Sequence, residues 1–338
     1  MKRNIQFGLI FLIGACLATA CAKSQESSLN EDNKIWLDGW LQFNHPGVEP
    51  SGKGIYVIED QPGTGKEYTQ KDAILSVEYT VTDLNGNIIS TTSKELAQQL
   101  GSYTKTDYYG ERIWVIGEGT VVAGVEDILT GMKVGGTRKA VIPSWLNVKK
   151  RYDKDEEYFE HNSKESHAIY EIKLADIIED LEKWECDSLV RYSKEHLGGR
   201  DTTSYGFYYR QVQKPVSDST FKKDTNIYIN YIGRRLDGIV FDTNIADTAK
   251  VYDLYSKERN YEPMQVQWGE KPEEIKMITD GNASGLILGF QKTLWEMHPM
   301  EKGTGVFISR FGYSVGGSGN KIPSFCPLRF DVEIVEKP

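Results

Sequence analysis

The chain has 338 residues, enough for two ordinary domains. Apolar residues make up 39% of it and charged residues 26%, which excludes a disordered chain. The formal net charge of -9 argues against a nucleic-acid-binding protein, because a phosphate-binding surface needs clustered lysine and arginine. We therefore expect a globular protein of two domains with no nucleic-acid partner.

Residues 1–21 have the pattern of an export signal. Lys2 and Arg3 form a basic start, and a short apolar run and small residues precede Cys21. The apolar run is too short for a membrane-spanning helix. We therefore interpret this segment as a targeting signal and not as part of the folded protein.

The end of this signal resembles that of a bacterial lipoprotein, in which the cysteine becomes the lipidated N-terminus. The resemblance implies lipidation at Cys21 and anchoring to a membrane of the cell envelope, on a periplasmic or outer-membrane face. Two alternatives stay open: lipidation at Cys16, and a soluble secreted protein that is cut nearby. Residues 22–50 would then hold a polar tether and an amphipathic helix from about 33 to 43. In that helix Trp36, Trp40 and Phe43 share a face.

Outside the signal, two cysteines are present, Cys186 and Cys326. An export context permits a disulfide, but the two cysteines lie in different predicted domains, so we expect free, buried thiols. No pair of histidines has the spacing of metal ligands, and we expect neither a metal nor another cofactor. The histidines are His45, His161, His167, His196 and His298.

The first predicted domain covers residues 51–177. A hairpin is expected over residues 74–92, with Asn85-Gly86 as its turn. After a polar, tyrosine-rich loop, a short helix is predicted from the apolar spacing of Val125, Ile128, Leu129 and Met132. A strand over residues 168–177 closes this domain. Residues 178–199 are then predicted to form a linker helix that ends at a pair of glycines.

The second predicted domain covers residues 200–338, and its centre is a hairpin over residues 229–244. Ile227, Ile229 and Tyr231 alternate along the first strand, as on a strand with one buried face. Asp237-Gly238 is the turn signal, and the chain returns through Phe241 and Asp242. The hairpin therefore brings an aromatic ring and a carboxylate close to Tyr231, with no evident nucleophile.

The second domain repeats the order of elements of the first. A loop, a strand, a short helix over residues 285–297 and a closing strand over residues 327–336 follow its hairpin. Only residues 270–284 have no counterpart. Two such units about 150 residues apart indicate an internal duplication.

These residues resemble an FKBP-type peptidyl-prolyl cis-trans isomerase domain. The likeness is stronger over residues 200–338, where Phe241-Asp242 and a terminal Phe-Asp-Val-Glu strand occur together, and weaker over residues 51–177. It implies an α+β fold of two FKBP-like domains, in each of which an antiparallel sheet wraps a short helix. It also implies a proline pocket of aromatic rings.

The resemblance assigns a role to each matching position of the second domain. Phe290 forms the floor of the pocket, Asp242 orders a polar group of its wall, and the Ile287 amide and Tyr313 donate hydrogen bonds to the substrate. The implied catalytic set is Tyr231, Phe241, Asp242, Ile287, Phe290, Tyr313 and Phe330, and the implied substrate-binding set is Val266, Leu286, Ile322 and Phe325. Met264 and Val266 replace an aromatic pair of the family, which affects substrate preference.

The first domain departs from this pattern at four positions. Ile89-Ser90 stands in place of Phe241-Asp242, Val125 in place of the floor ring, and Asn147 in place of Tyr313. The remaining aligned positions are Tyr79, Trp114, Val121, Val122 and Tyr170. We predict that the first domain is weakly active or inactive and acts as a spacer, a dimerisation surface or a chaperone module.

The resemblance implies a prolyl isomerase and folding helper of the bacterial envelope, with proline-containing unfolded or partner polypeptides as its ligands. Two alternatives stay open. One is a non-catalytic FKBP-like binding or chaperone module of an envelope or surface complex, and the other is a purely structural lipoprotein subunit. The convergence of the predicted site residues on one open pocket distinguishes them.

Overall fold

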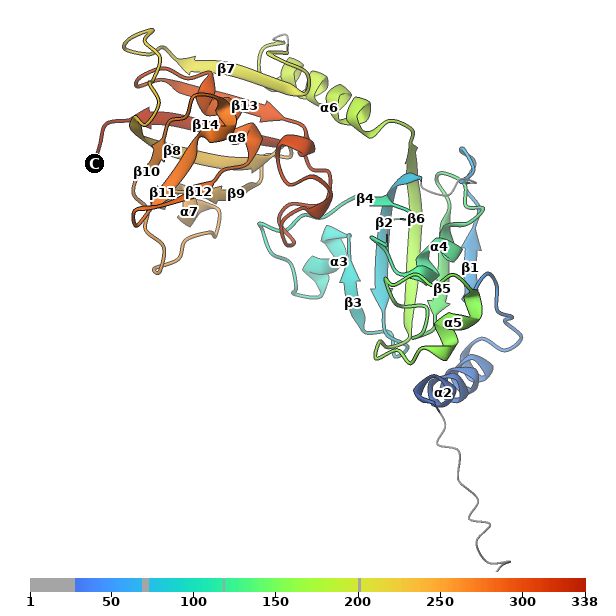
Figure 1. Ribbon diagram of the computed structural model, residues 1–338. Coiled ribbons are helices and arrows are strands. Elements are labelled where there is room, and N and C mark those ends of the chain that lie inside the picture. Colours follow the sequence, from blue (N-terminus) through green and yellow to red (C-terminus); the bar gives the residue numbers. More distant parts are fainter. Residues whose placement is uncertain (1–27, 69–72, 118, 200–201) are drawn as a thin grey trace, which may run out of the picture.

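The computed structural model describes residues 28–68, 73–117, 119–199 and 202–338. It contains two antiparallel sheets, each with a short helix packed against it, joined by a longer helix (Figure 1). The expected α+β class with two sheet domains is confirmed. The predicted signal, with Cys16 and Cys21, lies outside the described residues.

The first sheet belongs to the N-terminal half of the chain. Its strands are, in spatial order, β1 (Tyr56–Gln61), β5 (Thr137–Ile142), β6 (Ala168–Ile178), β2 (Ile74–Thr82) and β3 (Ile88–Thr91), with β4 (Arg112–Val115) also paired with β2. The helix α4 (Ala123–Leu129) packs on β5 and β6. It buries Val125, Ile128 and Leu129, the apolar positions from which the helix was predicted.

The second sheet belongs to the C-terminal half. Its spatial order is β12 (Asn282–Gly285), β11 (Lys276–Thr279), β10 (Met264–Gln267), β8 (Asn226–Arg235), β14 (Leu328–Val335), β13 (Lys302–Phe307) and β7 (Phe207–Gln213), with β9 (Val240–Thr243) also paired with β8. The helix α8 (Leu288–Trp295) packs on β13 and β14. Short 3₁₀ turns are η1 (Pro272–Glu274), η2 (Ser309–Phe311) and η3 (Ser314–Gly316).

The two sheets share one topology. The order β1-β5-β6-β2, with β3 and β4 on β2, recurs as β7-β13-β14-β8, with β9 and β10 on β8. This agrees with the duplication inferred from the sequence. The additional residues 270–284 form η1 and the β11–β12 hairpin, which extends the sheet beyond β10. All four residues of β12 are exposed, so this hairpin lies at the edge of the sheet.

Short helices lie in the long loops. They are α3 (Lys94–Gln99), α5 (Asp155–Glu160) and α7 (Ala246–Val251), and α3 and α7 occupy equivalent places after the hairpins of the two domains. The linker helix α6 (Leu181–His196) begins at the cap Asp180 and ends before Gly198, whose φ is +75°. Cys186 on α6 and Cys326 are free thiols, and both are half-buried.

The N-terminal helix α2 (Leu29–Asn44) begins earlier than predicted, because a capping box forms between Ser28 and Glu31. The expected face was wrong. Leu37 and Leu41 are buried against the first domain, whereas Trp36 is 53% exposed and Phe43 86% exposed. Among the described residues, none of the helices is long and apolar enough to cross a membrane.

Candidate active site

Strand β8 positions the first ring of the site. Its residues alternate between buried and half-buried, and Ile227, Ile229 and Tyr231 point into the core with 5%, 0% and 7% of their surface exposed. Only this alternation allows a strand to present one apolar face to a core. Tyr231 therefore lies inside the second domain, as the sequence predicted.

The predicted hairpin brings Phe241 and Asp242 to the same place. The turn closes at Gly238, which has a φ of +85°, and β9 pairs with β8 so that Gly233 faces Asp242. Gly233 leaves room for the neighbouring rings, because a Cβ atom there would lie 2.8 Å from the Phe241 ring and 3.2 Å from Phe330. A glycine on the central strand thus permits close packing of the aromatic rings.

Four aromatic residues form one cluster, which we call the ring cluster: Tyr231, Phe241, Phe290 and Phe330. Phe290 stacks on Phe330 with centroids 4.5 Å apart, and Tyr231 lies 5.5 Å from Phe290. Phe241 meets Phe330 edge-on at 5.8 Å. These distances are those of favourable aromatic contacts. Strands β8, β9 and β14 and helix α8 each contribute one ring.

A charged pair borders the ring cluster. The Tyr231 hydroxyl donates to Asp242 Oδ2 at 2.7 Å, and Arg259 Nη1 donates to Asp242 Oδ1 at 2.5 Å. Arg259 Nη2 also lies 3.1 Å from the Tyr231 hydroxyl. Burial, and then the negative charge of Asp242, raise the pKa of Tyr231 far above its ordinary value. The hydroxyl is therefore a permanent hydrogen-bond donor at physiological pH.

Arg259 did not appear among the residues predicted from the sequence. It comes from the loop between α7 and β10, 17 residues after Asp242. The available signal was a general one: a partly buried carboxylate needs a cation, and this loop carries a basic residue. Because the loop has no periodic pattern, the sequence offered no way to choose between its two basic residues, Lys257 and Arg259.

The other predicted residues fall into two groups. Val266 and Ile322 are buried in the same core as the ring cluster, and Leu286 and Ile287 are half-buried and pack against it. Ile287 is the N-cap of α8, so its amide lies outside the hydrogen bonding of the helix interior. Tyr313 is 36% exposed. Burial, and then the charge of Asp242, raise the pKa of Tyr313.

Phe325 is not part of that core. It adopts a φ of +55° and lines a crevice of about 450 Å³ between the domains, together with Tyr108, Trp184 and Cys326. The structure thus brings ten of the eleven predicted site residues to the core or the border of the ring cluster. Phe325 faces the first domain instead.

The equivalent region of the first domain is chemically different. The Tyr79 and Trp114 rings lie 5.2 Å apart, and the Tyr170 hydroxyl donates to Asn147 Oδ1 at 3.0 Å. Burial raises the pKa of Tyr170 to about 12. Ile89, which stands in the place of Phe241, is 62% exposed, and the neighbouring Ser90 has no carboxylate. This region therefore lacks both the charged pair and the stacked rings of the second domain.

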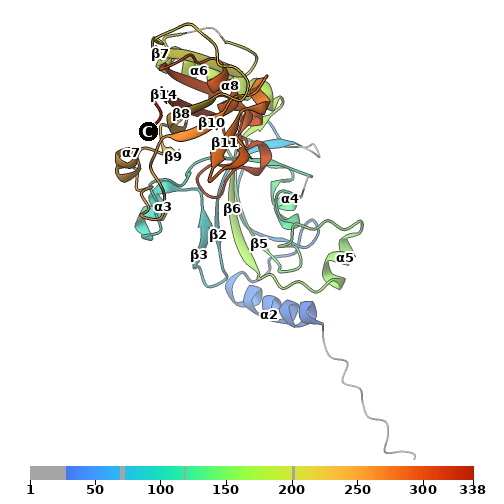
Figure 2. The ribbon, with the colours of Figure 1, turned by 60° about the vertical axis from the view of Figure 1, so that its left-hand side comes forward.

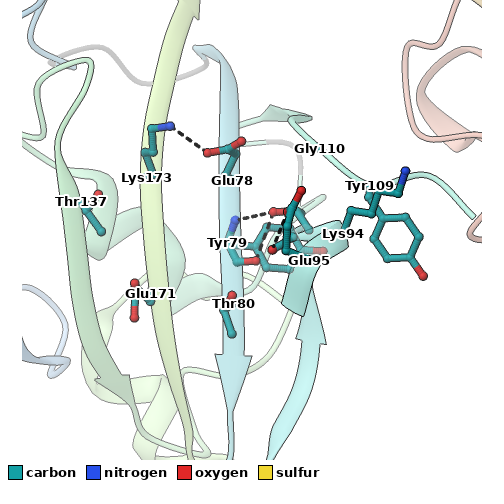
Figure 3. Close-up of a pocket in the computed structure, with 12 residues that line it drawn as sticks. Glu78, Tyr79, Thr80, Lys94, Glu95, Tyr109, Gly110, Thr137, Glu171 and Lys173 are labelled. Atoms are coloured by element: carbon teal, nitrogen blue, oxygen red, sulfur yellow. Dashed lines mark hydrogen bonds and ion pairs between the residues drawn. The ribbon is translucent and has the colours of Figure 1, made fainter. Parts of the chain in front are cut away.

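A polar hollow of about 530 Å³ also lies on the first sheet (Figure 3). Its walls include Glu78 on β2 and Lys173 on β6, which form an ion pair at 2.9 Å. Figure 3 shows these two side chains on neighbouring strands, with Lys94 and Tyr109 to one side of β2. Exposed ion pairs of this kind are well solvated. The hollow therefore does not resemble an apolar ligand pocket. Within the described part of the chain, no group of three or more potential metal ligands is present.

The geometry defines a class of protein in which an antiparallel sheet and a short helix enclose an apolar site without a nucleophile. Residues 65–175 match the family model of the FKBP-type peptidyl-prolyl cis-trans isomerase. The chain therefore carries a domain of the FKBP-type peptidyl-prolyl cis-trans isomerase family. The match lies in the first domain, although the sequence motifs had suggested a stronger likeness in the second.

Two further comparisons add little. No curated protein matches the chain. A crystal structure of the three FKBP domains of wheat FKBP73 is similar at 11% identity, with 83% of this chain and 94% of that chain covered, at a TM-score of 0.29. At such a score the likeness says nothing of how the domains correspond. The shared topology of the two sheets, described above, relates the second domain to the matched first domain.

Proposed function

We propose that this prolyl isomerase carries out its reaction in the second domain, at the ring cluster. One observation supports this most directly: Tyr231, Asp242 and Arg259 form a connected polar group at the border of stacked rings. The first domain has the family's sequence pattern but no such group. The proposal thus assigns the chemistry to one domain and leaves the other free for a different role.

The proposed mechanism requires no acid, base or nucleophile. Rotation about an X–Pro bond has a barrier of about 18–20 kcal/mol, because twisting removes the amide resonance. The planar amide is more polar than the twisted one, so contact with the apolar rings of Tyr231, Phe241, Phe290 and Phe330 would disfavour the planar form. Preorganised donors at the border then stabilise the twisted carbonyl group.

Two donors are available for the substrate. The Ile287 amide, at the beginning of α8, would hold one substrate carbonyl, and the Tyr313 hydroxyl would hold another from the opposite side. Asp242 would keep the Tyr231 hydroxyl oriented, and Arg259 would neutralise the charge of that carboxylate. None of these groups has to change its protonation state, in keeping with a reaction that transfers no proton.

The proposed ligands are proline-containing unfolded or partner polypeptides. Uncatalysed isomerisation takes tens to hundreds of seconds, so a catalyst would accelerate folding where proline is abundant. We further propose that the protein works in the bacterial cell envelope, tethered through a lipid on Cys21. The support for this location is the signal-like sequence of residues 1–21.

A second candidate function is a non-catalytic module that binds proline-containing segments. The rings that both functions would use are largely covered, since Phe290 and Phe330 show 3% and 4% of their surface. Such a module would bind the same ligands without accelerating their isomerisation. The experiment below separates the two functions.

The test is a prolyl-peptide isomerisation assay on the full chain. The variants Phe241→Ala and Asp242→Ala remove a ring and the carboxylate from the second domain. Their matched controls are Ile89→Ala and Ser90→Ala, the equivalent positions of the first domain. We expect each variant of the first pair to lower kcat/KM by about tenfold or more. Asp242→Ala loses charged hydrogen bonds worth about 1.5–3 kcal/mol each, and Phe241→Ala removes one apolar ring from the ring cluster. We expect the second pair to leave it unchanged.

A wild-type rate equal to the uncatalysed rate, with measurable peptide binding, would favour the non-catalytic module. Equal losses in both pairs of variants would instead assign activity to both domains. Circular dichroism of each variant shows whether a loss of activity reflects a loss of fold.

A further inference from the structure

Arg235 is a buried arginine at the end of β8, where the central hairpin of the second domain turns. Only 3% of its surface is exposed. A guanidinium group carries five N–H donors and keeps its charge at all ordinary pH values, so its burial demands a complete set of acceptors. The identity of those acceptors shows what the residue holds together.

The acceptors come from both domains. In the second domain, Nη1 donates to the carbonyl of Lys321 at 2.6 Å, and Nε and Nη2 donate to Asp237 Oδ2 at 3.1 and 2.9 Å. In the first domain, the carbonyl of Thr106 accepts from Nη1 at 2.9 Å and that of Asp107 accepts from Nη2 at 3.4 Å. Without the first domain, Arg235 would lose two of its four acceptor groups.

The neighbouring contacts join the same two segments. The guanidinium of Arg235 lies 5.3 Å from the ring centroid of Tyr108, a cation–π distance. The Tyr108 amide donates to the carbonyl of Asn320 at 2.8 Å. Lys105 and Asp253 form an exposed ion pair at 2.7 Å beside them. In Figures 1 and 2, helix α3, which precedes this segment, lies on the side of the first domain that faces the second.

The segment that the first domain contacts also carries residues of the candidate site. Asn320 and Lys321 directly precede Ile322, which is 3% exposed and belongs to the core around the ring cluster. The amide of Ser318 donates to the carbonyl of Ile322 at 2.7 Å, which closes this part of the loop. Tyr313 begins the same loop. The contacts that the first domain and Arg235 make with residues 320 and 321 therefore help to fix the position of Ile322 at the candidate site.

We propose that Arg235 and residues 106–108 form a clasp through which the first domain holds the loop of residues 313–327 in place over the site. Arg235 is then a positioning residue, since it touches the loop and not the substrate. The first domain has a role that does not depend on a pocket of its own. This inference rests on the proposed function of the second domain, because it concerns the regulation of that site.

The clasp predicts that its loss changes KM more than kcat. Arg235→Ala removes the hydrogen bonds of the guanidinium, and Tyr108→Ala removes the ring that lies 5.3 Å from it while keeping the backbone bond to Asn320. In the full chain each should raise KM for a short proline-containing peptide about tenfold, the effect of one lost contact of about 1.4 kcal/mol. The value of kcat should change less, because the ring cluster and the Ile287 amide lie outside the loop and keep their places. The matched control is Arg234→Ala. Arg234 is the preceding residue of β8, but it pairs with Asp331 at 2.9 Å on the other face.

Hydrogen exchange supplies a readout that does not depend on activity. In both clasp variants, the amides of residues 313–327 should exchange at least about tenfold faster than in the wild type, and Arg234→Ala should leave them unchanged. Tyr108→Ala alters only the first domain, so it tests the clasp even where Arg235→Ala impairs folding of the second.

Unchanged exchange of the loop in Tyr108→Ala would overturn the clasp, and so would equal effects of Arg234→Ala and Arg235→Ala. A wild-type chain without isomerase activity would contradict the proposed function instead. In that case the exchange measurement would still decide whether the first domain holds the loop.

Discussion

The Tyr231 hydroxyl donates a hydrogen bond of 2.7 Å to the Asp242 carboxylate, from one strand of the central hairpin to the other. Arg259 contacts both groups, so the carboxylate is neutralised where it borders the rings. A carboxylate held in this way cannot rotate freely. Its role is to orient its neighbours.

Tyr231→Phe tests that role. The change keeps the ring and removes one donor from Asp242, so we expect kcat/KM for a proline peptide to fall about tenfold, at about 1.4 kcal/mol for the lost bond. Stability should fall by a similar amount. Tyr228→Phe is the control, because Tyr228 lies on the same strand and points to the other face. Equal kcat/KM in Tyr231→Phe and the wild type would contradict an orienting role for the Tyr231–Asp242 bond.

Gly233→Ala tests the packing of the rings. The added methyl group would lie 2.8 Å from the Phe241 ring, so the rings must move apart. We expect a loss of about 1–3 kcal/mol in the free energy of unfolding, as for other overpacked cores, together with lower isomerase activity. Gly285→Ala is the control, since nothing lies within 4 Å of its added Cβ atom. Chemical denaturation of both variants measures the difference. If Gly233→Ala proved as stable as Gly285→Ala, the rings would not be tightly packed.

Glu185 on the linker helix predicts a dependence of stability on pH. It is 2% exposed and accepts hydrogen bonds from Ser309 N at 2.7 Å and Ser309 Oγ at 2.6 Å. Burial raises its pKa above the ordinary value of 4.5 despite these bonds. The proton is therefore bound more tightly in the folded state, which gains stability below the unfolded pKa and loses it as pH rises through the folded pKa.

Glu185→Gln should remove this dependence, because the amide does not titrate. Thermal unfolding is measured for the wild type and the variant from below pH 4.5 to neutrality. The Tm of the wild type should fall relative to that of the variant as the pH rises. Glu195→Gln, at an exposed position of the same helix, should follow the wild type at every pH. Parallel curves for the wild type and Glu185→Gln would show that Glu185 does not titrate in this range.

Asn30 attaches the N-terminal helix to the first domain. It is fully buried and its Nδ2 donates to the carbonyls of Phe159 and His161 at 2.8 and 2.9 Å. Asn30→Ala would leave these carbonyls without that donor, so we expect a loss of about 2 kcal/mol in the stability of the first domain. Asn44→Ala is the control, because Asn44 is exposed and bonds only within its own helix. Release of α2 to proteolysis in Asn30→Ala, and not in Asn44→Ala, would support the attachment. Equal resistance in both would contradict it.

Local patterns in the sequence were sufficient for most of the fold. The alternation of Ile227, Ile229 and Tyr231 predicted a strand with one buried face, and Asp237-Gly238 predicted its turn. Both signals act between residues close in sequence, where strand geometry and positive φ determine the outcome. The repeated order of such signals also indicated the duplication before any contact between strands was known.

The same kind of pattern gave a wrong prediction of the buried face of α2. Its aromatic residues suggested a face formed by Trp36, Trp40 and Phe43, but the helix buries Leu37 and Leu41. Periodicity identifies the faces of a helix without saying which of them meets a partner. The contacts of Asn30 with Phe159 of α5 and with His161, the residue that follows this helix, orient α2.

The sequence by itself determined the two domains and the hairpins, because period-two strands and glycine turns are local. The residues of the ring cluster were implied by the resemblance to a known family and not by these local patterns. Only the tertiary structure determined which charged side chains lie next to which polar groups. Arg259 pairs with Asp242 from a loop that has no periodic pattern in its sequence. Arg235 donates to the carbonyl group of Thr106, which lies 129 residues earlier in the chain. The physical reason is that a buried charge must be compensated by whichever polar groups the completed fold brings near it, and that proximity is not recorded in any local stretch of the chain.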